Sequence, residues 1–141
     1  MIEFIYEDDN FTLSNEGLYE FWIDKIIESE HKVLGDITYV FCDDEFLLAM
    51  NQQYLDHDTY TDIITFDYTE DDIISGEIFI SIERVTENAS EFKVDFINEL
   101  HQVMAHGVLH LCGYKDKSEA ESQLMRLKEE EKIKLFHVEQ F

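Results

Sequence analysis

The chain has 141 residues, of which 45% are hydrophobic and 13% aromatic, so it can form one folded domain and is not an intrinsically disordered chain. Ten basic residues against 33 acidic ones give a net charge of −23, which excludes a uniformly basic nucleic-acid-binding surface. Two cysteines cannot form a disulfide framework, and no segment approaches the roughly 18 consecutive apolar residues of a membrane span. These features predict a cytoplasmic protein that does not enter a membrane.

The first part of the chain predicts alternating strands and helices. Met1–Tyr6 alternates apolar and polar residues, as a half-buried strand does. Ser14–Glu30 carries apolar residues at helical spacing and is soon followed by Gly35, so it predicts a helix. Ile37–Cys42 is β-branched and aromatic and predicts a strand. A further helix then begins with Asp43 or Asp44 as its cap.

The second part predicts two strands followed by three helices. The strands are Asp62–Tyr68 and Glu77–Ile82, and the helices are Glu83–Phe92, Asp95–Cys112 and Ser118–Phe136. The last helix opens with Ser118-x-x-Glu121, the pattern of a capping box. Strands early and helices late favour the α+β class. We therefore predict a single domain over residues 1–141, with a small mixed four-stranded sheet covered by about five helices.

Two histidines lie four residues apart in the predicted helix Asp95–Cys112. His106 and His110 therefore project from one face, at the spacing of two imidazoles that bind one metal ion. Gly113 follows as a left-handed cap, and Asp116 supplies a carboxylate just beyond the turn. Two histidines and one carboxylate leave a fourth position open, which is typical of catalytic zinc. The pattern predicts one Zn²⁺ ion.

Other interpretations of the histidine pair stay open at this point. A pair at this spacing also occurs as ordinary surface or half-buried histidines. Zinc proteases share the spacing, but they carry a glutamate base where this chain has Gly107. A non-haem iron centre also uses two histidines and one carboxylate. Glycine within a helix is unfavourable by about 1 kcal/mol relative to alanine, so Gly107 indicates a close approach to the backbone.

Several separated segments resemble one family. HGVLHLCGYKD, from His106 to Asp116, resembles the HGxLHLxGYDH signature of the YbeY endoribonucleases. Residues 51–66 resemble the family's NxxYxxxDxxTDVLSF segment, and GEIFIS (residues 76–81) resembles its GDIxIS strand. Glu99-Leu100 resembles the EL pair that precedes its metal helix. The order and spacing agree over nearly the whole chain.

The resemblance implies an α+β fold and a metal-dependent endoribonuclease that cleaves single-stranded RNA in rRNA processing. His106, His110 and Asp116 then act in catalysis through the bound metal, which lowers the pKa of bound water and polarises a phosphoryl oxygen. The general base is not assigned. The implied partners are an rRNA precursor and a ribosomal subunit or ribosomal protein, with no DNA.

Three departures from the family pattern bear on this prediction. Asp116 stands where the family has its third histidine, and a carboxylate oxygen also binds zinc. Leu55 replaces the usual arginine, a plausible phosphate contact, and Tyr60 and Asp67 replace prolines. Leu55 and the net charge favour an alternative, a non-catalytic acidic ribosome-assembly factor with a structural metal site. A third alternative, an acidic mimic of nucleic acid, leaves the histidine motif unexplained.

The acidic charge is unevenly distributed. Residues 1–83 hold 22 acids and two bases, whereas residues 84–141 hold 11 acids and eight bases. RNA is therefore predicted to approach the C-terminal part, where Lys115 and Lys117 flank Asp116. Among the remaining residues, His101 is predicted to be a packing or surface residue and His57 a surface residue. The run of acids at residues 129–131 is predicted to be a solvated helix face.

Overall fold

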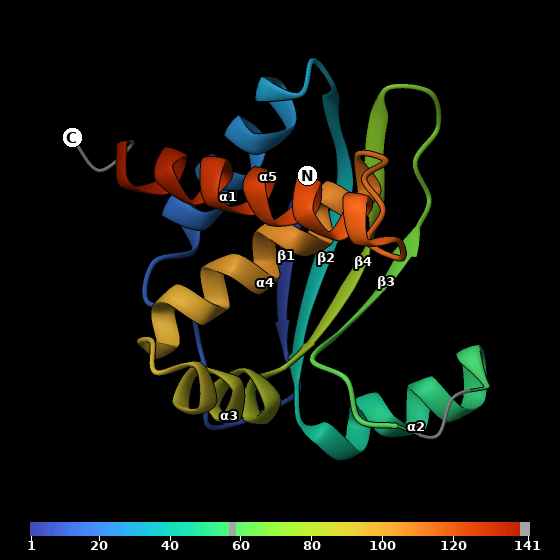
Figure 1. Ribbon diagram of the computed structural model, residues 1–141, viewed down its shortest axis with the longest axis vertical. Helices are drawn as coiled ribbons and strands as arrows, with labels where there is room; N and C mark the ends of the chain where they lie inside the picture. The colour runs from blue at the N-terminus through green and yellow to red at the C-terminus, as the bar shows by residue number, and fades with distance from the viewer. Residues whose placement is uncertain (57–58, 139–141) are drawn as a thin grey trace.

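A four-stranded sheet and five helices make up the described part of the chain, residues 1–56 and 59–138 of a computed structural model (Figure 1). The elements are β1 (Ile2–Tyr6), α1 (Glu16–Ser29), β2 (Val33–Cys42), α2 (Asp44–Leu55), β3 (Ile63–Asp67), β4 (Ile73–Ser81), α3 (Ile82–Phe92), α4 (Phe96–Leu111) and α5 (Glu119–Val138). The strand order is β1-β2-β4-β3. The pairs β1–β2 and β2–β4 are parallel, and β3 runs antiparallel to β4. This confirms the predicted α+β class with a mixed sheet. None of these helices is long and apolar enough to cross a membrane.

Both central strands start earlier than predicted. β2 begins at Val33 and β4 at Ile73, because these first residues pair with each other across the sheet. Gly35 therefore lies inside β2, at a register shift, and does not end α1, whose cap residue is Glu30. A Cβ atom on Gly35 would lie 2.2 Å from Ser75 Oγ and 2.9 Å from the Ile74 backbone oxygen, so any side chain at this position would require the two strands to shift. The predicted caps at Asp43 and at Ser118 with Glu121 are confirmed by their hydrogen bonds.

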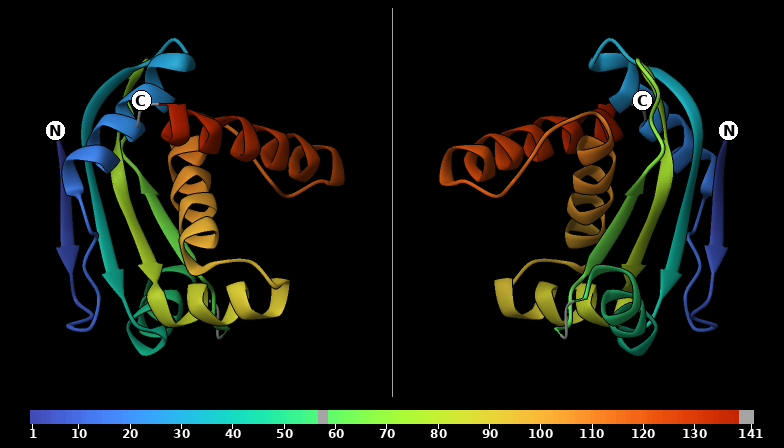
Figure 2. Two further views of the ribbon diagram at one scale, coloured as in Figure 1. Left: turned by 90° about the vertical axis from the view of Figure 1, so that its left-hand side faces the viewer. Right: turned by 90° about the vertical axis from the view of Figure 1, so that its right-hand side faces the viewer.

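The main core fills one face of the sheet. Figure 2 shows α4 running along this face, with α5 crossing one end of α4 and α3 lying at the other. Side chains from α1, α4 and α5 pack there against the inward residues of the strands. The opposite face carries a smaller cluster, in which Leu47 of α2 covers Cys42 and Ile64. The sheet thus provides a rigid support for α4, the helix that carries both histidines.

Gly107 lets α4 lie close to the sheet. A Cβ atom at this position would come within 2.9 Å of Ile78 Cγ2 and 3.0 Å of Ile63 Cδ1. The close approach inferred from the sequence is therefore made by two sheet side chains. Their proximity fixes the height of α4 above β3 and β4, and so the position of the neighbouring His106.

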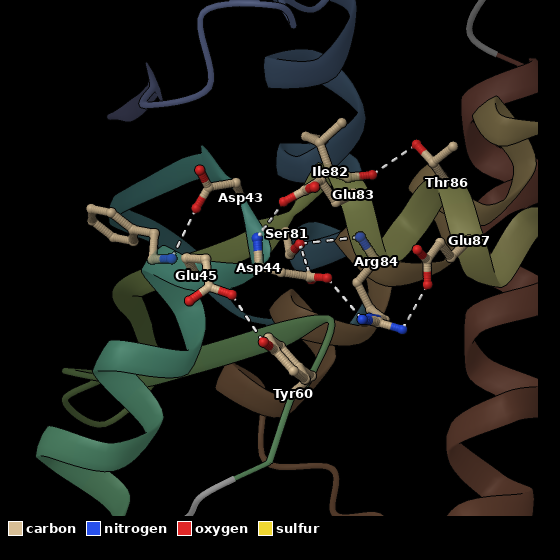
Figure 3. A network of polar contacts seen from close by, with 11 residues as sticks. Asp43, Asp44, Glu45, Tyr60, Ser81, Ile82, Glu83, Arg84, Thr86 and Glu87 are labelled. Carbon is tan, nitrogen blue, oxygen red and sulfur yellow. Dashed lines mark hydrogen bonds and ion pairs between the residues drawn. The ribbon is translucent and has the colours of Figure 1, made fainter.

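A polar network joins the beginnings of α2 and α3 (Figure 3). Asp44 Oδ2 accepts a hydrogen bond from Arg84 at 2.7 Å, and Asp44 Oδ1 accepts one from the Ser81 hydroxyl at 2.7 Å. The Arg84 guanidinium lies over the Tyr60 ring, and the Tyr60 hydroxyl donates to Glu45 at 2.9 Å. These contacts hold the segment that precedes β3. Asp62 is the last residue of that segment.

Candidate metal centre

The end of α4 and the turn after it bring the three predicted ligands together. His106 and His110 occupy successive turns of the helix. Gly113 then adopts a φ of 108°, and its N–H donates to the His110 carbonyl at 3.0 Å. This positive φ confirms the predicted glycine cap and turns the chain back. Asp116 consequently lies beside the histidines from which the chain has just departed.

The three donor atoms form a nearly regular triangle. His106 Nε2 and His110 Nε2 lie 2.9 Å apart, and Asp116 Oδ2 lies 3.2 Å from the first and 3.3 Å from the second. A tetrahedral zinc ion with bonds of about 2.0–2.1 Å sets its ligand atoms about 3.3 Å apart. Two nitrogens and one oxygen at these separations fit one such ion. Within residues 1–56 and 59–138, no second group of three such donors converges in this way.

Each histidine is oriented by an acceptor on its other ring nitrogen. His110 Nδ1 lies 2.9 Å from the Tyr114 carbonyl oxygen, and His106 Nδ1 lies 2.5 Å from Glu129 Oε2. A carbonyl or a carboxylate can only accept, so both Nδ1 atoms carry the proton. Both Nε2 lone pairs then face Asp116, as metal coordination requires.

The acceptor for His110 is itself anchored to α1. The Tyr114 hydroxyl donates to Glu30 Oε1 at 2.7 Å, and Lys132 Nζ lies 2.7 Å from Glu30 Oε2. Lys132 is 2% exposed. Although burial alone would raise the pKa of Glu30, hydrogen bonds from Lys132 and Tyr114 lower it, so Glu30 stays ionised and holds Tyr114 in place.

A cleft of about 290 Å³ extends from the centre along α4. Its polar lining comes from Asp62, Glu99, Gln102, His106, Asp116 and Glu129. Four of these side chains are carboxylates, so the cleft is strongly acidic. The cleft is suited to a cation and to ligands that are coordinated to that cation.

The crowding of carboxylates shifts the pKa values in the cleft. Burial raises the pKa of Asp62 and of Glu99, and the charge of Glu129 adds to both increases. Burial alone would lower the pKa of His106, but the hydrogen bond and charge of Glu129, with the charges of Asp116 and Asp62, raise it. The cleft therefore favours positive charge, whether this is carried by protons or by a metal ion.

Sequence reasoning was wrong about part of the acidic run on α5. Glu130 and Glu131 are exposed as predicted, but Glu129 is 6% exposed and faces His106. Lys132, the basic residue directly after this run, is buried as well. The missed signal is helical spacing, because Glu129 and Lys132 share the inward face of α5 with Met125 and Phe136.

The remaining predictions for individual residues have mixed outcomes. His101 was predicted to be either a packing or a surface residue, and it is a buried packing residue. Its Nε2 lies 3.0 Å from the Tyr19 hydroxyl. Leu55 lines a surface hollow outside the acidic cleft. Ile63 lines both the hollow and the cleft, so the two are neighbours. The prediction for His57 lies outside the described residues. Asp62, Gln102 and Glu99 reach the cleft although sequence reasoning gave them no role there.

Comparisons with known proteins agree with this architecture. A profile of the family described as Endoribonuclease YbeY matches residues 4–137. The chain is 60% identical over 140 residues to the Endoribonuclease YbeY of Flavobacterium psychrophilum, with 99% of each chain covered. It is 57% identical over 140 residues to that of Flavobacterium johnsoniae, covering 99% of this chain and all of the relative. The solution structure of TM1509 from Thermotoga maritima superposes with a TM-score of 0.68 at 28% identity, over 99% of this chain and 91% of that one.

Proposed function

The chain belongs to the YbeY endoribonuclease family, and on that premise we propose that it is a zinc-dependent endoribonuclease that cleaves single-stranded RNA during rRNA maturation in the cytoplasm. The observation that carries the proposal is the convergence of His106, His110 and Asp116 beside an acidic cleft. The histidine pair lies on a helix fixed against the sheet, and all three donors are partly accessible to solvent. An accessible three-ligand set is typical of a catalytic site.

The three ligands would hold one zinc ion, and their supports would keep them ready for it. When bound, zinc lowers the pKa of water and polarises a phosphoryl oxygen. The Tyr114 carbonyl and the Glu129 carboxylate accept from the two Nδ1 atoms, which would leave both Nε2 atoms available to hold such an ion. Asp116 contributes a negative charge that a third histidine would not, so it partly offsets the charge of the metal.

Asp62 is the residue we assign to proton transfer. It lines the same cleft as His106, and burial raises the pKa of its carboxyl. A carboxyl that remains protonated closer to neutral pH can donate to a leaving group. In this assignment a water oxygen forms a bond to phosphorus and releases a proton to solvent. The bond from phosphorus to the departing oxygen breaks, and Asp62 Oδ gives its proton to that departing oxygen.

RNA has a less repulsive approach to the site from the turn after α4. Lys115 and Lys117 are exposed on either side of Asp116, whereas most acids lie in residues 1–83. A strongly acidic protein repels a polyanion at long range, so contact is favoured where basic side chains reduce the field. Their position supports entry of a phosphodiester beside the proposed ligands.

Zinc-loaded protein is expected to cleave single-stranded rRNA fragments, and chelation of the metal should stop cleavage. The measurement is the rate of fragment appearance from a labelled RNA, with a duplex of the same sequence as control. Persistent absence of cleavage by zinc-loaded protein that still associates with ribosomal subunits would contradict the enzyme and support the assembly-factor alternative.

Asp62→Asn is expected to reduce cleavage by about 10²–10⁴-fold, the usual contribution of a general acid, while zinc binding is retained. Asp67→Asn is the matched control, because Asp67 is an exposed aspartate at the other end of β3. The rate of cleavage and the zinc content are measured on the same samples. Equal rates for Asp62→Asn and wild type would remove Asp62 from the proposed mechanism.

A further inference from the structure

Glu129 is the buried member of three consecutive glutamates on α5. Its side chain is 7% exposed, whereas Glu131 retains 55% and Glu130 is also exposed. Both of its carboxylate oxygens have partners on α4. Glu129 Oε2 lies 2.5 Å from His106 Nδ1, and Glu129 Oε1 accepts a hydrogen bond from Gln102 Nε2 at 2.9 Å.

The burial of the Glu129 carboxylate at this position is electrostatically unfavourable. A carboxylate removed from water loses solvation, and Glu129 also shares its cleft with Asp62 and Glu99. The charge of Glu129 raises the pKa of both of these acids. An apolar side chain would fill the junction between α4 and α5 without that repulsion. A carboxylate there instead provides a strong acceptor aimed at one imidazole nitrogen.

The two proposed histidine ligands differ in what orients them. His110 relies on a backbone carbonyl only four residues away, so its orientation follows from the local turn. His106 relies on a side chain from a different helix, 23 positions along the chain. Gln102 lies one turn before His106 on the same helix and fixes the second oxygen of that acceptor. The orientation of His106 therefore depends on the docking of α5.

We propose that Glu129 is a positioning residue for metal binding and that Gln102 orients it. Glu129 keeps His106 in the tautomer with the proton on Nδ1, which leaves the Nε2 lone pair free to bind the metal. Gln102 prevents the carboxylate from rotating away. This inference rests on the proposed metal site, and it assigns to α5 a role in forming that site.

The test compares zinc affinity in Glu129→Gln and Glu130→Gln, measured by competition with a chromophoric chelator and without RNA. Both changes remove one charge from adjacent positions of α5, but only Glu129 contacts His106. We expect about a 10–100-fold loss of zinc affinity in Glu129→Gln, as found for residues that orient metal-binding histidines, and less than about a twofold change in Glu130→Gln. Equal affinities in the two variants would overturn the inference.

A second readout separates positioning from a general loss of structure. Long-range ¹H–¹⁵N correlation spectra of the metal-free protein identify the tautomer of His106, which should carry its proton on Nδ1 in wild type and lose this preference in Glu129→Gln. Gln102→Ala should show a smaller loss of zinc affinity, and it decides the matter if Glu129→Gln does not fold. If wild type binds no zinc, the proposed function fails, whereas a neutral His106 that carries its proton on Nε2 and not on Nδ1 in wild type would overturn the inference alone.

Discussion

His106→Ala and His110→Ala are each expected to abolish stoichiometric zinc binding, and cleavage of RNA with it. Each change leaves one imidazole and one carboxylate, and two protein ligands seldom retain zinc. Metal content after gel filtration, together with the cleavage rate, provides the measurement. His31→Ala is the matched control, because His31 is an exposed histidine outside the cleft.

Asp116 allows a sharper test of the same site. Asp116→His should keep or tighten zinc binding, because it supplies a third imidazole at the place where the resemblance implies one. Asp116→Ala should weaken binding, since it removes the oxygen that lies 3.2 Å from His106 Nε2 and 3.3 Å from His110 Nε2. Zinc binding by Asp116→Ala as tight as that of wild type would show that the carboxylate is not a ligand.

Trp22→Ala is expected to lower the free energy of unfolding by about 3–5 kcal/mol, the usual effect of removing a buried aromatic residue. Trp22 is fully buried, its indole N–H donates to the Lys132 carbonyl at 2.8 Å, and its ring meets Phe136 edge-on at 5.3 Å. The change would leave a cavity between α1 and α5 and remove the hydrogen bond from the indole to the Lys132 carbonyl. A loss of this size is a large part of the about 5–15 kcal/mol that stabilises a typical domain.

Denaturant titration of Trp22→Ala and Phe21→Ala provides the measurement. Phe21 is the adjacent aromatic residue of α1, but it is 47% exposed, so its loss should change the free energy of unfolding by about 0.5 kcal/mol or less. Similar losses in the two variants would mean that Trp22 does not anchor α5. Since Trp22 contacts the helix that carries Glu129, its removal should also weaken zinc binding.

The features that sequence reasoning located correctly are those that depend on near neighbours in the chain. The spacing of His106 and His110 places both on one helical face whatever the helix packs against. Gly113 ends α4 through its own backbone conformation, and the box of Ser118 and Glu121 closes within four residues. The class of fold followed from the order of such elements along the chain.

The features it missed depend on contacts between distant segments. The first residues of β4 form a strand because β2 lies beside them, and local sequence patterns do not reveal that pairing. Glu129 looks like its exposed neighbours until α5 is placed across α4. Asp62 enters the cleft because β3 lies at the edge of the sheet next to α4. Local patterns therefore identified the proposed ligands but not the residues that orient or surround them.

The crossing of α4 by α5 also has a consequence for the time at which the centre is completed. A ribosome synthesises the chain from the N-terminal toward the C-terminal side, so both histidines emerge before the carboxylate that orients one of them. The sheet and α4 can begin to assemble while α5 is still being made. His106 acquires its acceptor only after Glu129 has emerged and the Trp22 indole N–H donates to the Lys132 carbonyl. The proposed metal centre is therefore complete only after α5 has docked. A nascent chain that stops before α5 would carry both histidines but would lack the carboxylate that orients His106.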